Sequence, residues 1–395
     1  MRISTSQMSD AAAAAISQRQ TDLFRTQAQI NSGKRIMVSS DDPVGAAQVA
    51  LSRTALDDTN RWAANQNTAK HSLSLTEATL GNMGDALQNI RETLVAAGSG
   101  VYDASQRASL AQELGHRLSE LVSIANTDNG GGGFLFSGFK DRILPFTLSG
   151  TSVGYAGDQG VRSLEVNSGT KMPVTQNGAD DFMNIFNGNG VFSSAATVAN
   201  GGSGVITVGS VINAALVTGH DYQVVFNAGG TTYDIVDTTT STTINSNVAY
   251  TSGAAITLPG IQVEISRTPS GGDTFAVNAS RQTSLFNTVA RGIALLGSGN
   301  STWRANELGA TLQDIDRALD HINLKRAEAG SHLAQLDDMA SAVADRALEH
   351  TGEISRLEDV DYAQAATQLA QQNVALQAAL ATYSKNTKLN LFDYL

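Results

Sequence analysis

Two long stretches of the chain carry apolar residues at alternating spacings of three and four. In the longer stretch, only Arg326 and His350 interrupt the apolar series. The series is Leu308, Leu312, Ile315, Leu319, Ile322, Arg326, Ala329, Leu333, Leu336, Ala340, Val343, Ala347, His350, Ile354 and Leu357. A repeat sustained over this length is typical of a coiled-coil helix. At Arg326 we expect an ion pair that fixes the register, the alternative being a side chain that extends to the surface.

An earlier stretch supplies a matching stripe. Its positions are Leu73, Thr76, Leu80, Met83, Leu87, Ile90, Leu94 and Ala97, and a shorter stripe follows at Leu110, Leu114, Leu121 and Ala125. Asp42 and Pro43 are suited to the N-cap and first turn of a helix. No proline occurs from Val44 to Leu144, and Gly98-Ser99-Gly100 is a natural stop. The sequence therefore predicts a helix over 43–97.

In the middle of the chain, apolar residues alternate with polar ones. Tyr222, Val224 and Phe226 follow this pattern, and Tyr233 and Ile235 resume it after a glycine-containing turn. The same alternation returns at Ile261, Val263 and Ile265, and at Phe275 and Val277. Such a period of two predicts half-buried β-strands. We also predict a β-hairpin over 130–138, where four glycines precede Phe134-Leu135-Phe136-Ser137-Gly138.

Composition divides the chain in the same way. Only 13 of the 139 residues from 142 to 280 are charged, and Gly, Thr, Ser, Asn and Val dominate there. We predict an α+β fold, in which both chain ends form a long antiparallel coiled-coil-like helical rod and the middle forms a mainly β domain. The predicted domains are 1–41 with 361–395 (terminal assembly helices), 42–141 with 281–360 (helical rod domain with the hairpin) and 142–280 (β-rich outer domain).

The two ends of the chain have an unusual helical pattern. Residues 362–384 contain no charged side chain, and Ala and Gln dominate them. A helix without charge on any face is usually buried on several sides, yet this one is too polar for the core of a monomer. We therefore predict that the ends pack between subunits, the alternative being a pair of frayed, solvated helices. The predicted subunit-interface residues are Ile16, Leu23, Ile30, Leu369, Leu376, Leu380 and Tyr383.

Several function classes are disfavoured by composition. The net charge of −11 argues against a generic nucleic-acid binder. The absence of Cys excludes disulfides and thiolate metal sites. No run of ten apolar residues occurs, so we expect no membrane insertion. The first 20 residues do not resemble a Sec signal peptide.

Residue patterns typical of enzymes are not found either. The six His residues include no HExxH motif and no helical i, i+4 pair, and the glycines at 130–133 are not followed by a P-loop Lys-Ser/Thr. Asp41-Asp42 is better suited to a helix cap than to a metal pair, and Asp180-Asp181 is expected in a loop. We predict no catalytic, cofactor-binding or metal-binding residues.

Short motifs in both ends of the chain resemble those of the flagellin superfamily. They are Ile30-Asn31-Ser32-Gly33-Lys34-Arg35-Ile36, Ser39-Ser40-Asp41-Asp42-Pro43, Asn126-Thr127, Phe134 to Gly138, Arg326 to Gly330, and Ile354 to Tyr362. The resemblance covers about 1–141 and 281–395. The start Met1-Arg2-Ile3-Ser4-Thr5 and the end Leu389 to Leu395 are similar to the hook–filament junction branch of that superfamily.

The resemblance implies a non-enzymatic structural adaptor of the bacterial flagellum, which acts outside the cell after type III flagellar export without a cleaved signal peptide. The implied partners are the first hook-associated protein, flagellin, further copies of this chain in a ring, and a flagellar export chaperone. It implies no cofactor, no nucleic acid and no membrane insertion. The alternatives are filament flagellin itself, an enzyme with its activity in 142–280, or a carbohydrate-binding β domain.

Overall fold

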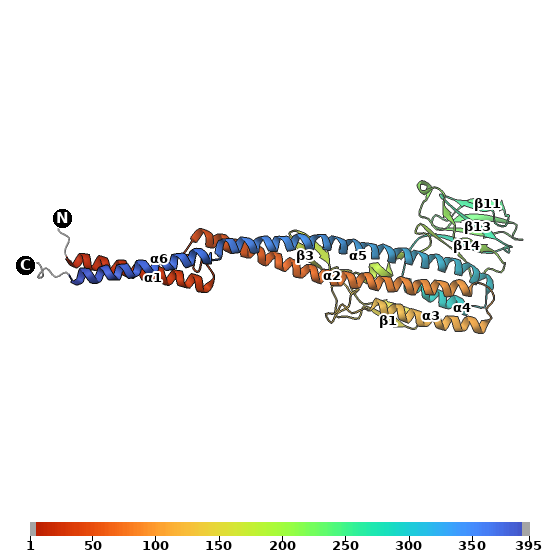
Figure 1. The fold of residues 1–395 in the computed structure, drawn as a ribbon. Coiled ribbons are helices and arrows are strands. Elements are labelled where there is room, and N and C mark those ends of the chain that lie inside the picture. The colour runs from red at the N-terminus through yellow and green to blue at the C-terminus, as the bar shows by residue number, and fades with distance from the viewer. Residues whose placement is uncertain (1–4, 389–395) are drawn as a thin grey trace, which may run out of the picture. The chain divides into compact units, whose positions relative to one another are not determined.

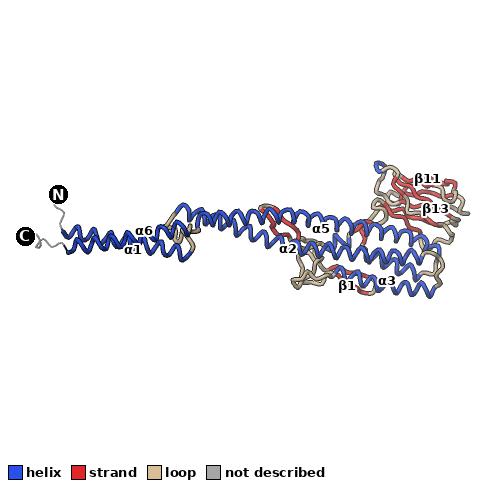
Figure 2. Tube along the Cα trace, in the orientation of Figure 1, coloured by secondary structure: helices blue, strands red, loops and turns tan. Residues whose placement is uncertain are grey.

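The computed structural model describes residues 5–388 and has helical ends around a mainly β middle (Figures 1 and 2). The predicted α+β class is confirmed. The helices are α1 (Thr5–Ser32), α2 (Pro43–Ala97), α3 (Ala104–Ala125), α4 (Leu285–Gly297), α5 (Ser301–Glu358) and α6 (Tyr362–Lys388). Met1 to Ser4 and Leu389 to Leu395, which contribute to the predicted terminal assembly helices, lie outside the described residues.

The chain forms two compact units, of which one contains 1–64 and 339–395 and the other contains 65–338. Helices α2 and α5 each contribute residues to both units. The three-part division predicted from composition is finer than this one and stays a prediction.

Helix α2 begins and ends where the sequence indicates. Asp42 caps it, because its Oδ1 accepts a hydrogen bond from the Gly45 N–H at 2.9 Å. The helix ends at Ala97, just before the glycines, and Gly100 has a φ of +75° that favours glycine. The predicted helix over 43–97 is confirmed.

In the larger unit, α2 and α5 run antiparallel. Arg91 Nε lies 2.6 Å from Asp316 Oδ1, and Arg326 Nε lies 2.5 Å from Glu77 Oε1, so residue numbers rise along one helix as they fall along the other. The ion pair predicted for Arg326 is therefore confirmed within the chain. All eight stripe positions of α2 are buried, and the six from Leu80 to Ala97 share a core with α3, α4 and α5.

An aromatic cluster forms part of this helical core. Phe136, Phe146, Phe182 and Phe286 are each 0% exposed. The ring centroids of Phe136 and Phe182 are 4.8 Å apart, and those of Phe146 and Phe286 are 5.4 Å apart. These edge-on and tilted contacts join residues from the helices to residues from the loops and strands, so the cluster anchors the non-helical segments on the helical core.

The predicted hairpin over 130–138 is wrong in detail. The backbone makes two isolated antiparallel bridges there, Asp128 with Phe134 and Ser137 with Asn177, and no pair of strands. Leu135 and Phe136 are both buried, so the segment lacks the alternating burial of a half-buried strand. Instead, Asn129 Oδ1 accepts hydrogen bonds from the N–H groups of two glycines and holds a compact turn.

Three short antiparallel strand pairs precede or flank the main β region. They are β1 (Phe146–Ser149) with β2 (Ser152–Tyr155), β3 (Ser163–Asn167) with β4 (Thr170–Pro173), and β5 (Ile185–Phe186) with β15 (Gln282–Thr283). The second pair is attached to α2, because Gln66 Nε2 donates to the Val166 carbonyl at 2.8 Å and Ser72 Oγ donates to the Val174 carbonyl at 2.6 Å. Polar α2 residues therefore hold this hairpin by its backbone.

The main β region consists of two sheets that share one apolar core. One sheet has the order β11-β10-β9-β14-β6, and the other has the order β12-β13-β7 with β8 beside β13. Their strands are β6 (Phe192–Ala196), β7 (Val205–Ile206), β8 (Ser210–Val211), β9 (Tyr222–Phe226), β10 (Thr232–Asp237), β11 (Thr242–Ala249), β12 (Ala255–Leu258), β13 (Ile261–Ser266) and β14 (Thr274–Ala279). The predicted alternating segments are β9, β10, β13 and β14, and their apolar side chains are buried as expected.

Replacing an aromatic ring of the cluster will weaken the larger unit. We expect Phe146→Ala to lower the free energy of unfolding by about 3–5 kcal/mol, because it removes a fully buried ring and leaves a cavity. Urea unfolding followed by near-UV circular dichroism measures this. Phe139→Ala is the matched control, since Phe139 is 62% exposed. Equal effects of the two substitutions would contradict the anchoring role.

Candidate assembly surface

Helices α1 and α6 lie side by side in the smaller unit (Figure 1). Ser9 Oγ, near the start of α1, is 3.5 Å from the hydroxyl of Tyr383, near the end of α6, so the two helices are antiparallel. Leu23 and Thr26 on α1 and Ala365 on α6 are buried. No other residue of the pair whose side chain the structure describes is buried, so these two helices have a thin core of their own.

The structure brings the seven predicted interface residues onto the two paired helices. Leu23 is buried, and Leu380 is 45% exposed. The other five are half-buried, namely Ile16, Ile30, Leu369, Leu376 and Tyr383. Six of the seven are thus at least partly covered within this chain, while Leu380 is exposed. Their role between subunits stays a prediction.

Other apolar side chains of the pair face outward. Met8 is 54% exposed, Phe24 67% and Val374 66%. The predicted residues of each helix are spaced three, four or seven positions apart, and sequence reasoning missed Phe24 and Val374 because they fall outside that spacing. The available signal was a large apolar residue in an otherwise polar helical segment. Together with Leu380, they are among the apolar side chains that the helix pair leaves exposed.

A polar cleft separates part of α1 from α6. Its volume is about 560 Å³, and its lining includes Arg25 and Gln29 on α1 and Gln368 and Gln372 on α6. The side-chain oxygen Oε1 of Gln372 is buried without a hydrogen-bond partner. A buried acceptor without a partner costs free energy. The pair therefore offers unused hydrogen-bonding capacity beside its exposed apolar groups.

Residues 33–42, the connecting segment between α1 and α2, are fixed to the end of α5. The Arg35 N–H donates to the Glu358 carbonyl at 2.6 Å, and the Val360 N–H donates to the Gly33 carbonyl at 2.9 Å. The carboxylate of Glu358 lies 2.7 Å from Lys34 Nζ and 2.5 Å from Arg53 Nη2. Burial opposes ionisation of Glu358, but its hydrogen bonds with these two cations outweigh burial and lower its pKa.

The two aspartates before α2 have structural roles. Asp41 Oδ2 accepts hydrogen bonds from the Met37 and Val38 N–H groups at 3.0 and 3.1 Å, and these bonds lower its pKa. Its other oxygen lies 2.8 Å from Arg25 Nη2. With Asp42 as the cap of α2, the predicted capping role is confirmed. The motifs that carry the family resemblance thus coincide with the contacts that hold the connecting segment.

A buried carboxylate in the larger unit was missed by sequence reasoning. Asp180-Asp181 was expected in a loop, but the pair lies in a π-helical turn over Ala179–Met183. Asp181 Oδ2 is buried without a hydrogen-bond partner, and Lys325 Nζ is 3.9 Å from the other oxygen. Burial raises the pKa of Asp181 to about 7, although Lys325 opposes the shift. The nearby Phe182 ring, packed in the aromatic cluster, places the turn against the core.

Within residues 5–388, no group of three or more metal-ligating side chains is arranged to hold a metal ion. Over the same part of the chain, no helix is both long and apolar enough to span a bilayer.

Two family models match the chain ends. The bacterial flagellin N-terminal helical region matches residues 3–141, and the bacterial flagellin C-terminal helical region matches residues 312–395. The flagellar hook-associated protein 3 of Salmonella typhimurium is 24% identical over 393 residues, which cover 100% of this chain and 99% of that protein.

Two solved structures are also similar. FlgL of Xanthomonas campestris is 30% identical with a TM-score of 0.68, and the match covers 74% of this chain and 99% of that one. Flagellar hook-associated protein 3 of Legionella pneumophila is 27% identical with a TM-score of 0.74, and the match covers 78% of this chain and 98% of that one.

The helical ends and their matches define a flagellin-like structural protein of the bacterial flagellum. Within that class, the chain belongs to the FlgL family, the hook-associated protein 3 family of hook–filament junction proteins. The resemblance read from the sequence motifs is confirmed.

Removing the charge of Glu358 will loosen the connecting segment. We expect Glu358→Gln to destabilise the smaller unit by about 1–3 kcal/mol, because two cations lose a buried anionic partner. Hydrogen exchange of the amides in residues 33–42 should speed up in the variant. Glu349→Gln, an exposed position on the same helix, should leave these exchange rates unchanged. Protection that persists in Glu358→Gln would contradict this role.

The stability of the larger unit should depend on the protonation of Asp181. Its folded-state pKa of about 7 lies above the ordinary value of 3.8, so the folded chain binds more protons than the unfolded chain between those values. Stability from this group is complete below about pH 4 and is lost as the pH rises through 7. When urea unfolding is measured at pH 5 and at pH 7.5, the free energy of unfolding should fall less between the two pH values in Asp181→Asn than in the parent. Asp320→Asn, at an exposed position, should follow the parent, and parallel profiles for all three proteins would refute the assignment.

Proposed function

We propose that this protein joins the flagellar hook to the flagellin filament by packing its paired terminal helices between subunits. The observation that carries the proposal is the α1–α6 pair, which exposes Phe24 and Val374 at 67% and 66% on helices with few charges. Transfer of apolar surface from water to a neighbouring subunit provides the driving force. The glutamines of the cleft provide hydrogen bonds that set the register.

The proposed partners follow from the family. The first hook-associated protein lies on the hook side, flagellin lies on the filament side, and further copies of this chain complete a ring. The match of both ends to flagellin helical regions supports a terminal surface compatible with flagellin packing. We further propose that the protein acts outside the cell, after type III flagellar export without a cleaved signal peptide, and that an export chaperone binds it beforehand.

We propose a separate role for each of the three predicted domains. Residues 1–41 with 361–395 make the contacts between subunits, 42–141 with 281–360 stiffen the molecule, and 142–280 face outward. Two observations support an outer role for the last of these: it is poor in charge, and the buried apolar residues from Phe192 to Val277 form a two-sheet core of their own. General acid–base catalysis needs positioned titratable groups, and such groups are sparse there, so we propose no enzymatic activity.

Filament flagellin is the second candidate function, since both flagellin family models match the ends. Two observations favour the junction role. The flagellin models leave residues 142–311 unmatched, whereas the match to the hook-associated protein 3 of Salmonella typhimurium extends over the whole chain. Deletion of the gene separates the candidates: hooks without filaments and flagellin released into the medium support the junction role. Long filaments grown from the purified protein alone would instead support flagellin.

A charge on the exposed apolar surface should abolish the junction. We expect Val374→Glu to restore no motility in a strain that lacks the gene, because an ionised carboxylate must be desolvated when the surface is covered. Val374→Thr is the control, since it keeps the shape without the charge. Circular dichroism should show that both variants keep the folded middle domain. Full motility with Val374→Glu would contradict the proposed surface, and Leu380→Glu tests the same surface independently.

A further inference from the structure

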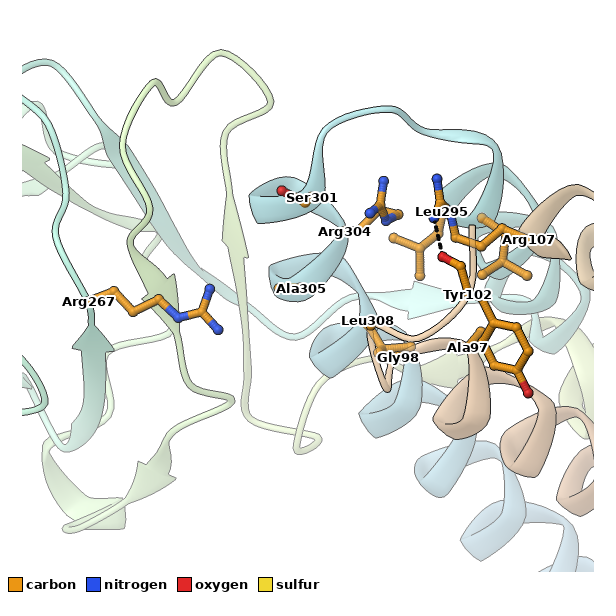
Figure 3. Close-up of a pocket in the computed structure, with 12 residues that line it drawn as sticks. Ala97, Gly98, Tyr102, Arg107, Arg267, Leu295, Ser301, Arg304, Ala305 and Leu308 are labelled. Atoms are coloured by element: carbon orange, nitrogen blue, oxygen red, sulfur yellow. Dashed lines mark hydrogen bonds between the residues drawn. The ribbon is translucent and has the colours of Figure 1, made fainter. Parts of the chain in front are cut away.

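A small cavity lies in the larger unit, where the end of α2 and the α4–α5 turn approach the β region (Figure 3). Its volume is about 200 Å³, whereas one water molecule in liquid takes about 30 Å³. The cavity therefore has room for a group larger than one water. Its apolar wall consists of Ala97, Leu295 and Leu308, and its polar wall consists mainly of arginines.

Three arginines converge on this cavity. Arg107 comes from α3 and Arg304 from α5, and their guanidinium groups lie next to each other in Figure 3. Arg267, from the loop after β13, extends toward them from the facing wall. Each has a different origin in the fold, so the cluster is a product of the tertiary structure.

These cations have no ionised partner within the described chain. Among the ion pairs of residues 5–388, none involves Arg107, Arg267 or Arg304. Arg107 Nη1 donates to the Tyr102 carbonyl at 2.7 Å, and Arg304 Nη1 donates to the Ser298 carbonyl at 2.6 Å. Backbone carbonyls hold the two side chains in place but do not neutralise them. The positive charge is therefore left uncompensated in a chain whose net charge is −11.

Two further observations indicate that these arginines lack hydrogen-bond acceptors and a compensating charge. Arg107 Nε is buried without a hydrogen-bond partner. Burial lowers the pKa of Arg304 below its usual value, and the neighbouring Arg107 lowers it further. Like charges held together in a partly dry site repel each other unless an anion lies between them.

The backbone at Arg267 is also unusual. Its φ is +66°, in the left-handed region that side-chain-bearing residues rarely adopt. Ser252 Oγ accepts a hydrogen bond from the Arg267 N–H at 2.8 Å, and the Tyr250 hydroxyl donates to the Arg267 carbonyl at 2.8 Å. Two side chains thus hold Arg267 in a strained conformation, and such strain gathers at functional sites.

We propose that this cavity binds an oxyanion, with Arg107 and Arg304 as its main ligands and Arg267 as a third cation from the facing wall. Guanidinium groups present paired N–H donors that match the oxygens of carboxylates and phosphates. The oxyanion is either a free inorganic anion or the carboxylate of an acidic side chain of a neighbouring subunit. Its binding links the helical end of the unit to the β region.

Isothermal titration of the full-length protein with inorganic phosphate at low salt tests the site. We expect saturable binding of one phosphate per chain, weakened at least tenfold in Arg107→Gln and in Arg304→Gln. The control is Arg117→Gln, on α3 like Arg107 but paired with Glu120 on the surface. It should bind phosphate as the parent does. Arg267→Gln should weaken phosphate binding less than the other two cavity variants do. Circular dichroism verifies that every variant is folded.

The source of the oxyanion is decided by a second measurement. If phosphate does not bind, but Arg107→Gln and Arg304→Gln cells lose filaments while Arg117→Gln cells keep them, the ligand is a carboxylate of a neighbouring subunit. Saturable phosphate binding with normal filaments in the variants supports a free anion. The proposal is overturned if phosphate does not bind and filaments are normal in both variants. It is also overturned if Arg117→Gln weakens binding as much as the cavity variants do.

Discussion

Burial of the apolar stripe of α2 against α5 and the neighbouring helices is the interaction on which the rest of the structure depends. The stripe is a continuous row of side chains that α2 alone cannot cover, so α2 requires α5 and their neighbours. Ion pairs such as Arg91–Asp316 and Arg326–Glu77 then select one antiparallel register. Once that register is set, α3 and α4 complete the core of the larger unit, and Gln66 and Ser72 are placed to hold a hairpin.

Regular periodicity made this part of the fold predictable. Asp42 and Pro43 mark the start of α2 by local chemistry, and the β9, β10, β13 and β14 strands show strict alternation. The sheet order was not predictable, because β9 pairs with β14 across a long separation in sequence. The turn at 130–138 was not predicted either, because its backbone N–H groups donate hydrogen bonds to the side chain of Asn129 and not to a neighbouring strand.

The candidate surface was predictable only in outline. The charge-free segment 362–384 indicated packing between subunits, but most of the residues selected by their spacing are partly covered within the chain. Which side chains remain outside depends on how α1 faces α6, and no local pattern encodes that. The same holds for Asp181 and for the arginine cavity, whose members come from separate elements and are brought together by tertiary packing.

The antiparallel pairing of α1 with α6 also constrains when the molecule becomes complete. Ser9 and Tyr383 are separated by 374 positions in the sequence. A helix pair closed across so long a separation has a high loop-closure cost, and we expect it to form late in folding. Of the helices that the structure describes, α1 is synthesised first and α6 last. The side chains of α1 that pack against α6 therefore stay without this partner until the last of these helices has been made.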